Sequence, residues 1–270
     1  MHAVLVRLPG NSESQSVSTA GPPSELEYRG LGEGAAPGYS GASGSRTLRT
    51  VLALVFAVVF GAGTARAQQT LFNVPSADVL DKGKTYVEVD DLYGGDPDVQ
   101  VITIRGVQGL GGRVEAGVNL GGFVQPGRST PTIVPNVKWQ PYRTDTFFVT
   151  TGALGLFYLR GSKDGDPAAL VYSHVAWRAP TKTRLTAGAW AASDGYAGPG
   201  AERGGLFGFE QPLGRTLTVA ADWFTGKNGL GYFTPGVFVA AGAVTIYAGY
   251  SIKNGDSKGN GLLAELGVTF

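Results

Sequence analysis

Few side chains in this 270-residue sequence belong to the types that carry out nucleophilic or acid–base catalysis. The chain has two histidines and no cysteine, which excludes a cysteine nucleophile and a thiolate metal site. His174 directly follows Ser173, but neighbouring side chains on a strand point to opposite faces, so these two cannot form a nucleophile–base pair. We therefore predict no catalytic residue and no enzymatic activity. The alternative is a lipid hydrolase in which the partner of the histidine lies on an adjacent strand.

Metal ligands are equally sparse. One histidine after residue 2 and the lack of cysteine do not supply the ligand set of an ordinary zinc site. Two acidic segments, 96–98 and 163–166, offer carboxylates, yet they lack the regularly spaced oxygen ligands of a calcium loop. We expect solvated turns there and no metal or cofactor. Ca²⁺ or Mg²⁺ that bridges lipopolysaccharide phosphates is the alternative.

Charged residues form a more informative pattern because they recur at every second position. Glu88 and Asp90 are two residues apart, as are Arg113 and Glu115, and a valine lies within each pair. An alternation of period two is typical of a strand that faces two environments. The side chains predicted to share the polar face, which would line the lumen of a barrel, are Glu88, Asp90, Arg105, Arg113, Glu115, Asn119, Asn136, Lys138, His174, Arg178, Arg184, Glu210, Asp222 and Glu265.

The elements that carry this pattern are twelve segments of about ten residues, separated by clusters of Gly, Pro, Asn and Asp. Such spacing is typical of strands joined by turns. The predicted strands are 84–93, 99–108, 113–123, 131–140, 146–158, 168–179, 183–192, 203–211, 215–225, 230–240, 243–253 and 261–270. A tilted strand of this length crosses a bilayer, so we predict an all-β fold, a transmembrane antiparallel up-and-down β-barrel of about 12 strands. A soluble β-sandwich is the alternative, because it would show the same alternation.

Aromatic residues favour the membrane barrel because they gather near strand ends, as interfacial girdles do. One predicted girdle consists of Trp139, Phe147, Trp177, Phe209 and Phe270, and the other of Tyr93, Phe123, Tyr158, Trp223, Tyr232 and Tyr250. Short turns, expected on the periplasmic side, alternate with loops that are longer on average. The charge-free stretch 230–252 is long enough for a membrane helix, but its proline and four glycines favour a hairpin.

The first 82 residues differ from the rest in composition. Residues 1–45 are rich in Gly, Ser, Pro and Ala without periodicity, which predicts a disordered or overcalled N-terminal extension. In 46–67, arginines precede a short apolar run and an Ala-Arg-Ala site, which is typical of a secretory signal peptide. A membrane anchor is the alternative, but the run is short for it. We predict a periplasmic or plug-like segment at 68–82 and the outer-membrane β-barrel at 83–270.

The charge of the chain is low and balanced. Only 16% of the residues are charged and the formal net charge is +1, which argues against a nucleic-acid-binding protein. Five arginines and four glutamates fall within residues 1–67, so the remainder carries 17 charges of each sign.

The signal-peptide pattern and the last predicted strand together resemble bacterial outer-membrane β-barrel proteins, especially small porin-like barrels of an uncharacterised family. That strand ends in an aromatic residue preceded by apolar residues at alternate positions, Leu266, Val268 and Phe270. The resemblance implies a location in the bacterial outer membrane and recognition of this strand by the outer-membrane assembly machinery. The implied partners are that machinery and outer-membrane lipid with lipopolysaccharide, and no nucleic acid. The oligomeric state stays open.

The function expected from this fold depends on how full the lumen is. Side chains fill a barrel of eight strands, whereas sixteen or more strands leave a water channel. Twelve strands lie between these cases, and small residues such as Gly208, Gly249 and Gly267 on the polar face leave room. We predict a narrow porin-like channel for small polar solutes with a mixed-charge lumen. The alternative is a non-conducting structural or interaction barrel with a salt-bridged interior.

Overall fold

The computed structural model describes residues 69–94, 100–125, 128–159, 166–255 and 259–270. The predicted N-terminal extension at 1–45 and signal peptide at 46–67 lie outside these ranges, as does most of the acidic segment 163–166 and all of 96–98. Within the described ranges, no helix combines the length and apolar character that crossing a membrane requires.

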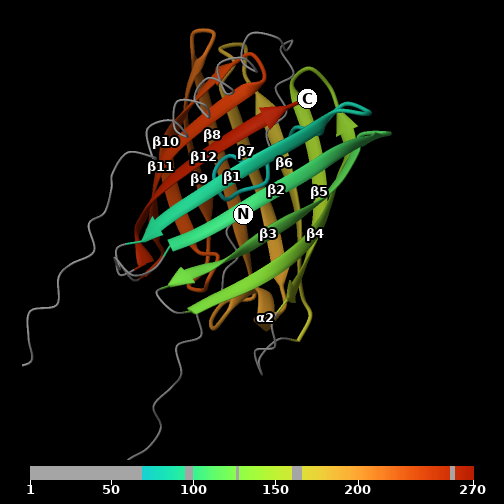
Figure 1. The fold of residues 1–270 in the computed structure, drawn as a ribbon. Coiled ribbons are helices and arrows are strands. Elements are labelled where there is room, and N and C mark those ends of the chain that lie inside the picture. The colour runs from blue at the N-terminus through green and yellow to red at the C-terminus, as the bar shows by residue number, and fades with distance from the viewer. Residues whose placement is uncertain (1–68, 95–99, 126–127, 160–165, 256–258) are drawn as a thin grey trace, which may run out of the picture. The chain divides into compact units, whose positions relative to one another are not determined.

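Twelve antiparallel strands form one closed barrel in the described residues, which confirms the predicted fold class. The strands are β1 (Thr85–Gly94), β2 (Gln100–Gly111), β3 (Val114–Gln125), β4 (Arg128–Arg143), β5 (Phe147–Tyr158), β6 (Ala168–Arg178), β7 (Arg184–Ala192), β8 (Arg203–Leu213), β9 (Leu217–Phe224), β10 (Tyr232–Ala241), β11 (Val244–Lys253) and β12 (Gly261–Thr269). Each strand pairs with its neighbours in sequence, and β1 pairs with β12 to close the sheet (Figure 1). Closure pairs the backbone groups that a sheet edge would otherwise expose to lipid.

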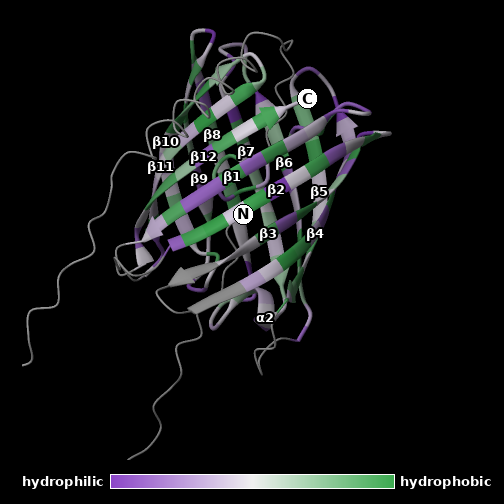
Figure 2. Cartoon of the chain, in the orientation of Figure 1, coloured by the Kyte–Doolittle hydropathy of each residue, from purple (hydrophilic) through white to green (hydrophobic). Residues whose placement is uncertain are grey.

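Side-chain exposure alternates along the strands as the sequence predicts. In β6, Tyr172 and His174 are buried inside the barrel, whereas Val171 and Val175 are exposed on its outer face. Hydrophilic and hydrophobic residues accordingly alternate along strands such as β1 and β2 (Figure 2). The exposed side chains of the outer face are largely Val, Leu, Ile and aromatic residues, which suits contact with hydrocarbon.

The two ends of the barrel differ in their connections. At the short-turn end, β1 begins, β12 ends, and tight turns join β2 to β3, β4 to β5, β6 to β7, β8 to β9 and β10 to β11. The opposite, long-loop end carries α2 (Asp194–Ala197), a four-residue helix that the sequence analysis missed because so short a segment shows no periodicity. The charge-free stretch 230–252 forms the paired strands β10 and β11, which confirms the hairpin.

The predicted aromatic girdles are only partly correct. At the short-turn end, Trp139, Phe147, Trp177, Phe209 and Phe270 are all exposed on the outer face, as predicted. At the long-loop end, Tyr93, Trp223 and Tyr250 are exposed too, and the side chain of Phe123 lies outside the described set. The assignment of Tyr158 and Tyr232 is wrong. Both are partly buried on the lumen side, because each lies two positions along its strand from a buried lumen residue, Leu156 for Tyr158 and Thr234 for Tyr232.

Candidate functional site

A segment that precedes β1 occupies the barrel interior. Residues 69–82 are called the plug below. They coil inside the wall (cyan in Figure 1) up to Leu80, and Asp81 and Lys82 are exposed where the segment leaves the lumen. Its first part is a hairpin in which Thr70 bridges Pro75 and the amide of Ser76 donates to the carbonyl of Gln69 at 3.0 Å. Leu71 and Phe72 are fully buried. The sequence left open whether this segment lies in the periplasm or in the barrel, and the structure places residues 69–80 in the lumen.

The carboxylate of Asp222, on β9, holds the tip of this hairpin. Its Oδ2 accepts the backbone amides of Phe72, Asn73 and Val74 at 3.0, 2.5 and 2.6 Å. The amide nitrogen of the Asn73 side chain also donates to Thr234 Oγ1 at 2.8 Å. Asp222 is almost completely buried, so its charge is stabilised by these converging amides in place of water.

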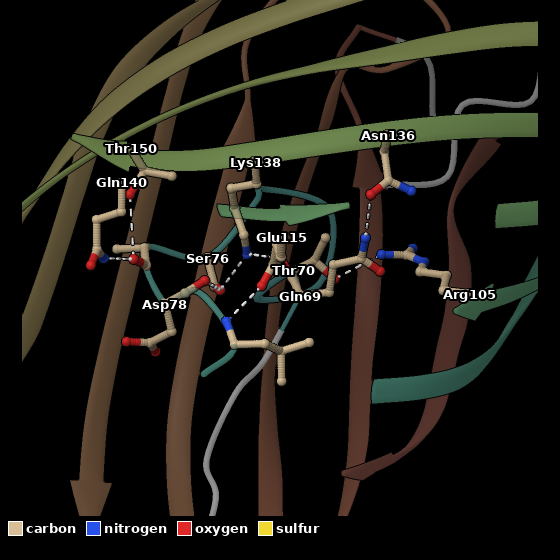
Figure 3. A network of polar contacts seen from close by, with 12 residues as sticks. Gln69, Thr70, Ser76, Asp78, Arg105, Glu115, Asn136, Lys138, Gln140 and Thr150 are labelled. Carbon is tan, nitrogen blue, oxygen red and sulfur yellow. Dashed lines mark hydrogen bonds and ion pairs between the residues drawn. The ribbon is translucent and has the colours of Figure 1, made fainter. Parts of the chain in front are cut away.

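A second anchor joins the plug to β3 and β4 (Figure 3). Glu115 and Lys138 lie directly opposite each other in the register of these strands, and their side chains form an ion pair of 2.8 Å. Glu115 Oε2 accepts the amide of Leu80 at 2.8 Å, while Lys138 Nζ lies 3.5 Å from Ser76 Oγ. Lys138 Nζ also donates to the carbonyl of Gln69 at 3.4 Å. One cross-strand ion pair therefore contacts the plug at three points.

A third anchor lies near the short-turn end. Arg184, on β7, pairs with Glu210 directly opposite on β8, and its Nη1 donates to Asp78 Oδ2 of the plug at 2.6 Å. Burial raises the pKa of Asp78, but the charge and hydrogen bond of Arg184, with Lys138 and Arg178 nearby, outweigh it and leave that pKa below its usual value. Asp78 is therefore ionised at neutral pH.

A cluster of three carboxylates surrounds Arg105 on the other side of the lumen. Arg105 Nε lies 2.6 Å from Asp90 and 3.5 Å from Glu88, and its Nη1 donates to Thr70 Oγ1 of the plug at 2.9 Å. Oxygen atoms of Glu88, Asp90 and Glu265 lie within 4.8 Å of one another, the spacing of a metal site. The guanidinium already supplies positive charge to this cluster, so the geometry does not require a metal ion.

Three glycines that face the lumen lie against the plug, whereas the space beside Gly267 is occupied by Tyr86 of β1. A Cβ atom at Gly236 would lie 2.5 Å from Phe72 Cζ, and one at Gly249 would lie 3.3 Å from Phe72 Cε1. A Cβ at Gly208 would similarly lie 3.0 Å from Leu71 Cδ2. The space that these small residues provide is therefore filled by the plug.

An apolar cluster fills the lumen toward the long-loop end. It is built from inward side chains of β4 to β9, from α2 and from the plug: Val74, Val134, Leu154, Leu156, Ala168, Leu170, Tyr172, Trp190, Tyr196, Ala197, Leu206, Phe224 and Leu230. The residues predicted to line the lumen do not include this cluster, because only polar and small side chains were expected there. The signal was present, because Tyr172 and Trp190 share the alternation of the polar-face residues His174 and Gly188.

Most residues predicted to line the lumen face it. Those that are buried inside the barrel are Glu88, Asp90, Arg105, Glu115, Asn119, Lys138, His174, Arg184, Glu210, Asp222 and Glu265, and Asn136 is half-buried. The placement of Arg113 is wrong. This residue is exposed in the β2–β3 turn with a φ of 61°, because the alternation ends where the strand ends. Arg178 lies at the short-turn mouth and is only partly buried. Without Arg113 and Arg178, the buried charges described inside the barrel are six acids and three bases.

His174 and Ser173 point in opposite directions. Ser173 is exposed on the outer face, while the ring of His174 is buried and stacked on Tyr172 with centroids 5.8 Å apart. Among the described residues, neither ring nitrogen of His174 has a hydrogen-bond partner. Ser173 is therefore not aligned with this histidine, as the alternation of the strand predicts.

A cavity of about 490 Å³ lies between the plug and the wall at the short-turn end. This vestibule is lined by the charged side chains Asp78, Arg143, Arg178, Lys182, Arg184 and Glu210. Phe238 and Tyr247 lie on the wall of β10 and β11. A second, much smaller cavity of about 20 Å³ lies beside Gln69, Thr70 and Pro75 of the plug.

No protein-family model matches the chain, and no curated protein matches its sequence. Several solved barrels are similar in fold. An active-site mutant of outer membrane phospholipase A of Escherichia coli is 12% identical with a TM-score of 0.43, over 80% of this chain and 96% of that one. An outer membrane channel of Pseudomonas putida is 12% identical with a TM-score of 0.43, over 72% and 98%.

The translocator domain of the autotransporter NalP of Neisseria meningitidis is 13% identical with a TM-score of 0.37, over 84% of this chain and 97% of that one. Similarities of this size assign neither a family nor an activity. The structure itself has a closed sheet, an apolar outer face and a polar interior, the combination that a bilayer requires of a spanning β-protein. The chain is thus a twelve-stranded β-barrel of the outer-membrane type, in agreement with the resemblance noted in its sequence.

Proposed function

We propose that this chain is an outer-membrane channel for small polar solutes that the plug closes at rest. The observation that supports this is the filling of the lumen by a segment separate from the wall. A twelve-stranded barrel is wider than one that strand side chains fill by themselves. Here the residual space is taken by residues 69–82, which are held through side-chain contacts at Asp222, Glu115 and Arg184.

Departure of the plug would uncover a lumen lined by six acids and three bases. Three cross-strand ion pairs, Glu88 with Arg105, Glu115 with Lys138 and Arg184 with Glu210, remain with the wall. Each side chain of such a pair lies opposite its partner in the register, so the pairs stabilise the wall whether or not the plug is present. The open lumen would be polar and would favour cations over anions.

Planar-bilayer conductance tests this proposal. We expect the wild-type chain to be silent and Asp222→Ala to produce discrete conductance steps, because that change removes the acceptor of three plug amides. The chain has no cysteine, so adding Ala77→Cys and Thr150→Cys to the Asp222→Ala variant allows one disulfide, which would tie the plug to β5. Thr150 Oγ1 lies 3.3 Å from the carbonyl oxygen of Ala77. Oxidation should abolish the steps and reduction should restore them.

The alternative function is a non-conducting structural or interaction barrel. The apolar cluster at the long-loop end favours it, because Tyr196 and Leu230 cover the lumen there in addition to the plug. Heat-modifiable gel mobility establishes that each variant is folded. If the folded Asp222→Ala barrel shows no conductance steps, whether the engineered disulfide is reduced or oxidised, the channel is rejected and the structural function is left.

We also propose that the barrel is not an enzyme and that its last strand is read by the outer-membrane assembly machinery. Leu266, Val268 and Phe270 alternate on the outer face, and Phe270 is 60% exposed at the end of β12. Its main chain still pairs with Thr85, whose carbonyl accepts the Phe270 amide at 2.8 Å. Phe270→Ala should therefore slow insertion without unfolding the finished barrel, whereas Leu262→Ala, an exposed residue at the opposite end of β12, should not. Equal insertion rates for wild type and Phe270→Ala would contradict the assignment.

A further inference from the structure

The cationic side of the vestibule has no carboxylate to pair with. Arg184 is shared between Asp78 and Glu210 and so takes up both acids of the lining. Within the described part of the chain, Arg143, Arg178 and Lys182 form no ion pair. Three cations therefore line this cavity without an acid of their own.

Two of these cations converge on one aromatic ring. The guanidinium carbons of Arg143 and Arg178 lie 5.9 and 4.8 Å from the centroid of the Phe148 ring, both within the range of a cation–π contact. Phe148 is buried at the edge of the plug, in contact with the cluster of Ala77 and Ala176. The ring orients both guanidiniums toward one place but supplies no negative charge to offset their repulsion.

The wall of the vestibule that β9, β10 and β11 form has a different character. Phe238 and Tyr247 lie with ring centroids 5.2 Å apart and line the cavity. The hydroxyl-bearing residues Thr216, Thr218 and Thr245 line it as well. This wall suits an uncharged organic body, and the volume of about 490 Å³ lies in the range of small-molecule sites.

We propose that the vestibule is a binding site for a small organic anion, whose carboxylate or phosphate head pairs with Arg143, Arg178 and Lys182 and whose body packs on Phe238 and Tyr247. Guanidinium groups match the geometry of both kinds of head. The site lies at the short-turn mouth and shares only Arg184 and Glu210 with the charges counted along the proposed path. The binding does not depend on whether the barrel conducts.

Isothermal titration of the full chain in detergent tests the site without a bilayer, so its result is independent of the channel experiment. The probes are benzoate and phenyl phosphate, with benzyl alcohol as the uncharged counterpart. We expect at least one anion to bind about tenfold or more tightly than benzyl alcohol, and the tighter of the two identifies the head group. Added NaCl should weaken anion binding, because the vestibule is open to screening.

Substitutions in the lining locate the site. Arg143→Gln and Arg178→Gln should each weaken anion binding about tenfold, the lower end for a hydrogen bond to a charged group, and leave benzyl alcohol unaffected. Arg113→Gln is the matched control, since it removes the same charge at the same end of the barrel from an exposed turn outside the vestibule. If an arginine variant fails to fold, Lys182→Gln in the β6–β7 turn replaces it as the lining variant. Equal affinity for anion and alcohol, or binding unchanged in the folded lining variants, would overturn the proposal.

Discussion

Replacing Asp222 by alanine should release the plug hairpin from the wall while the barrel stays closed. The Asp222 carboxylate is the acceptor for three successive plug amides, those of residues 72–74. Hydrogen bonds to a charged group contribute about 1.5–3 kcal/mol each, so the three bonds contribute at most about 4.5–9 kcal/mol to docking, less the cost of taking the carboxylate out of water. The main-chain ladders of β9 do not involve this side chain.

The other terms in docking roughly cancel. Burial of three apolar side chains, Leu71, Phe72 and Val74, favours the docked hairpin by about 5–9 kcal/mol in total. Ordering the backbone of residues 70–75 costs about 6–12 kcal/mol. Arg105 and Thr234 add one hydrogen bond each, to Thr70 and from Asn73, whereas Asp222 accepts three amides, so the balance depends mainly on Asp222. Asp222→Asn keeps one oxygen acceptor but loses the charge, and neutral hydrogen bonds are about half as strong, so this variant should be intermediate.

Amide hydrogen exchange followed by mass spectrometry measures the release directly. In the wild type the amides of Phe72, Asn73 and Val74 should be protected, and in Asp222→Ala they should exchange at rates typical of a disordered segment. Asp91→Ala is the matched control, because that carboxylate accepts from Gln100 at 2.8 and 2.7 Å and is bonded to no plug residue. If the three amides stay protected in a folded Asp222→Ala barrel, the assignment of this carboxylate as the main anchor is wrong.

Two further predictions concern the fit and the charge of the plug. Gly236→Ala places a Cβ 2.5 Å from the ring of Phe72 and within overlap of the Ala248 carbonyl oxygen on β11, whereas Gly106→Ala meets nothing nearer than 3.9 Å. The first should lower stability by about 1–3 kcal/mol and the second should not, and the urea midpoints of the two variants would show whether this is so. Because the pKa of Asp78 is lowered in the folded state, its ion pair with Arg184 stabilises the plug above the unfolded value of about 3.9 and is lost as pH falls through the lower folded value. Exchange protection of residues 77–82 should thus be constant from pH 8 to 5 and fall below pH 4, and Asp78→Asn should lack that acid-dependent loss.

The strands and their faces could be predicted because local alternation encodes them. Glu88, Val89 and Asp90 alternate between lumen and outer face in the structure as they do in the sequence. The rule failed where a strand ended, as at Arg113, since a left-handed turn residue has no defined face. It also gave no information about which charges would pair, because the opposition of Glu115 and Lys138 depends on the length and geometry of the turn between their strands.

The sequence by itself determined the number of strands, the polarity of each face and the hairpin of β10 and β11, because each of these follows from residues that are close together in the chain. Only the tertiary structure decided whether the lumen is open. The contact of Phe72 with Gly236 and the bonds from Asp222 to the plug join residues about 150 positions apart. From the sequence, a glycine on the polar face predicts free space in the lumen. The plug that fills this space has no alternation of its own, so its position could not be predicted.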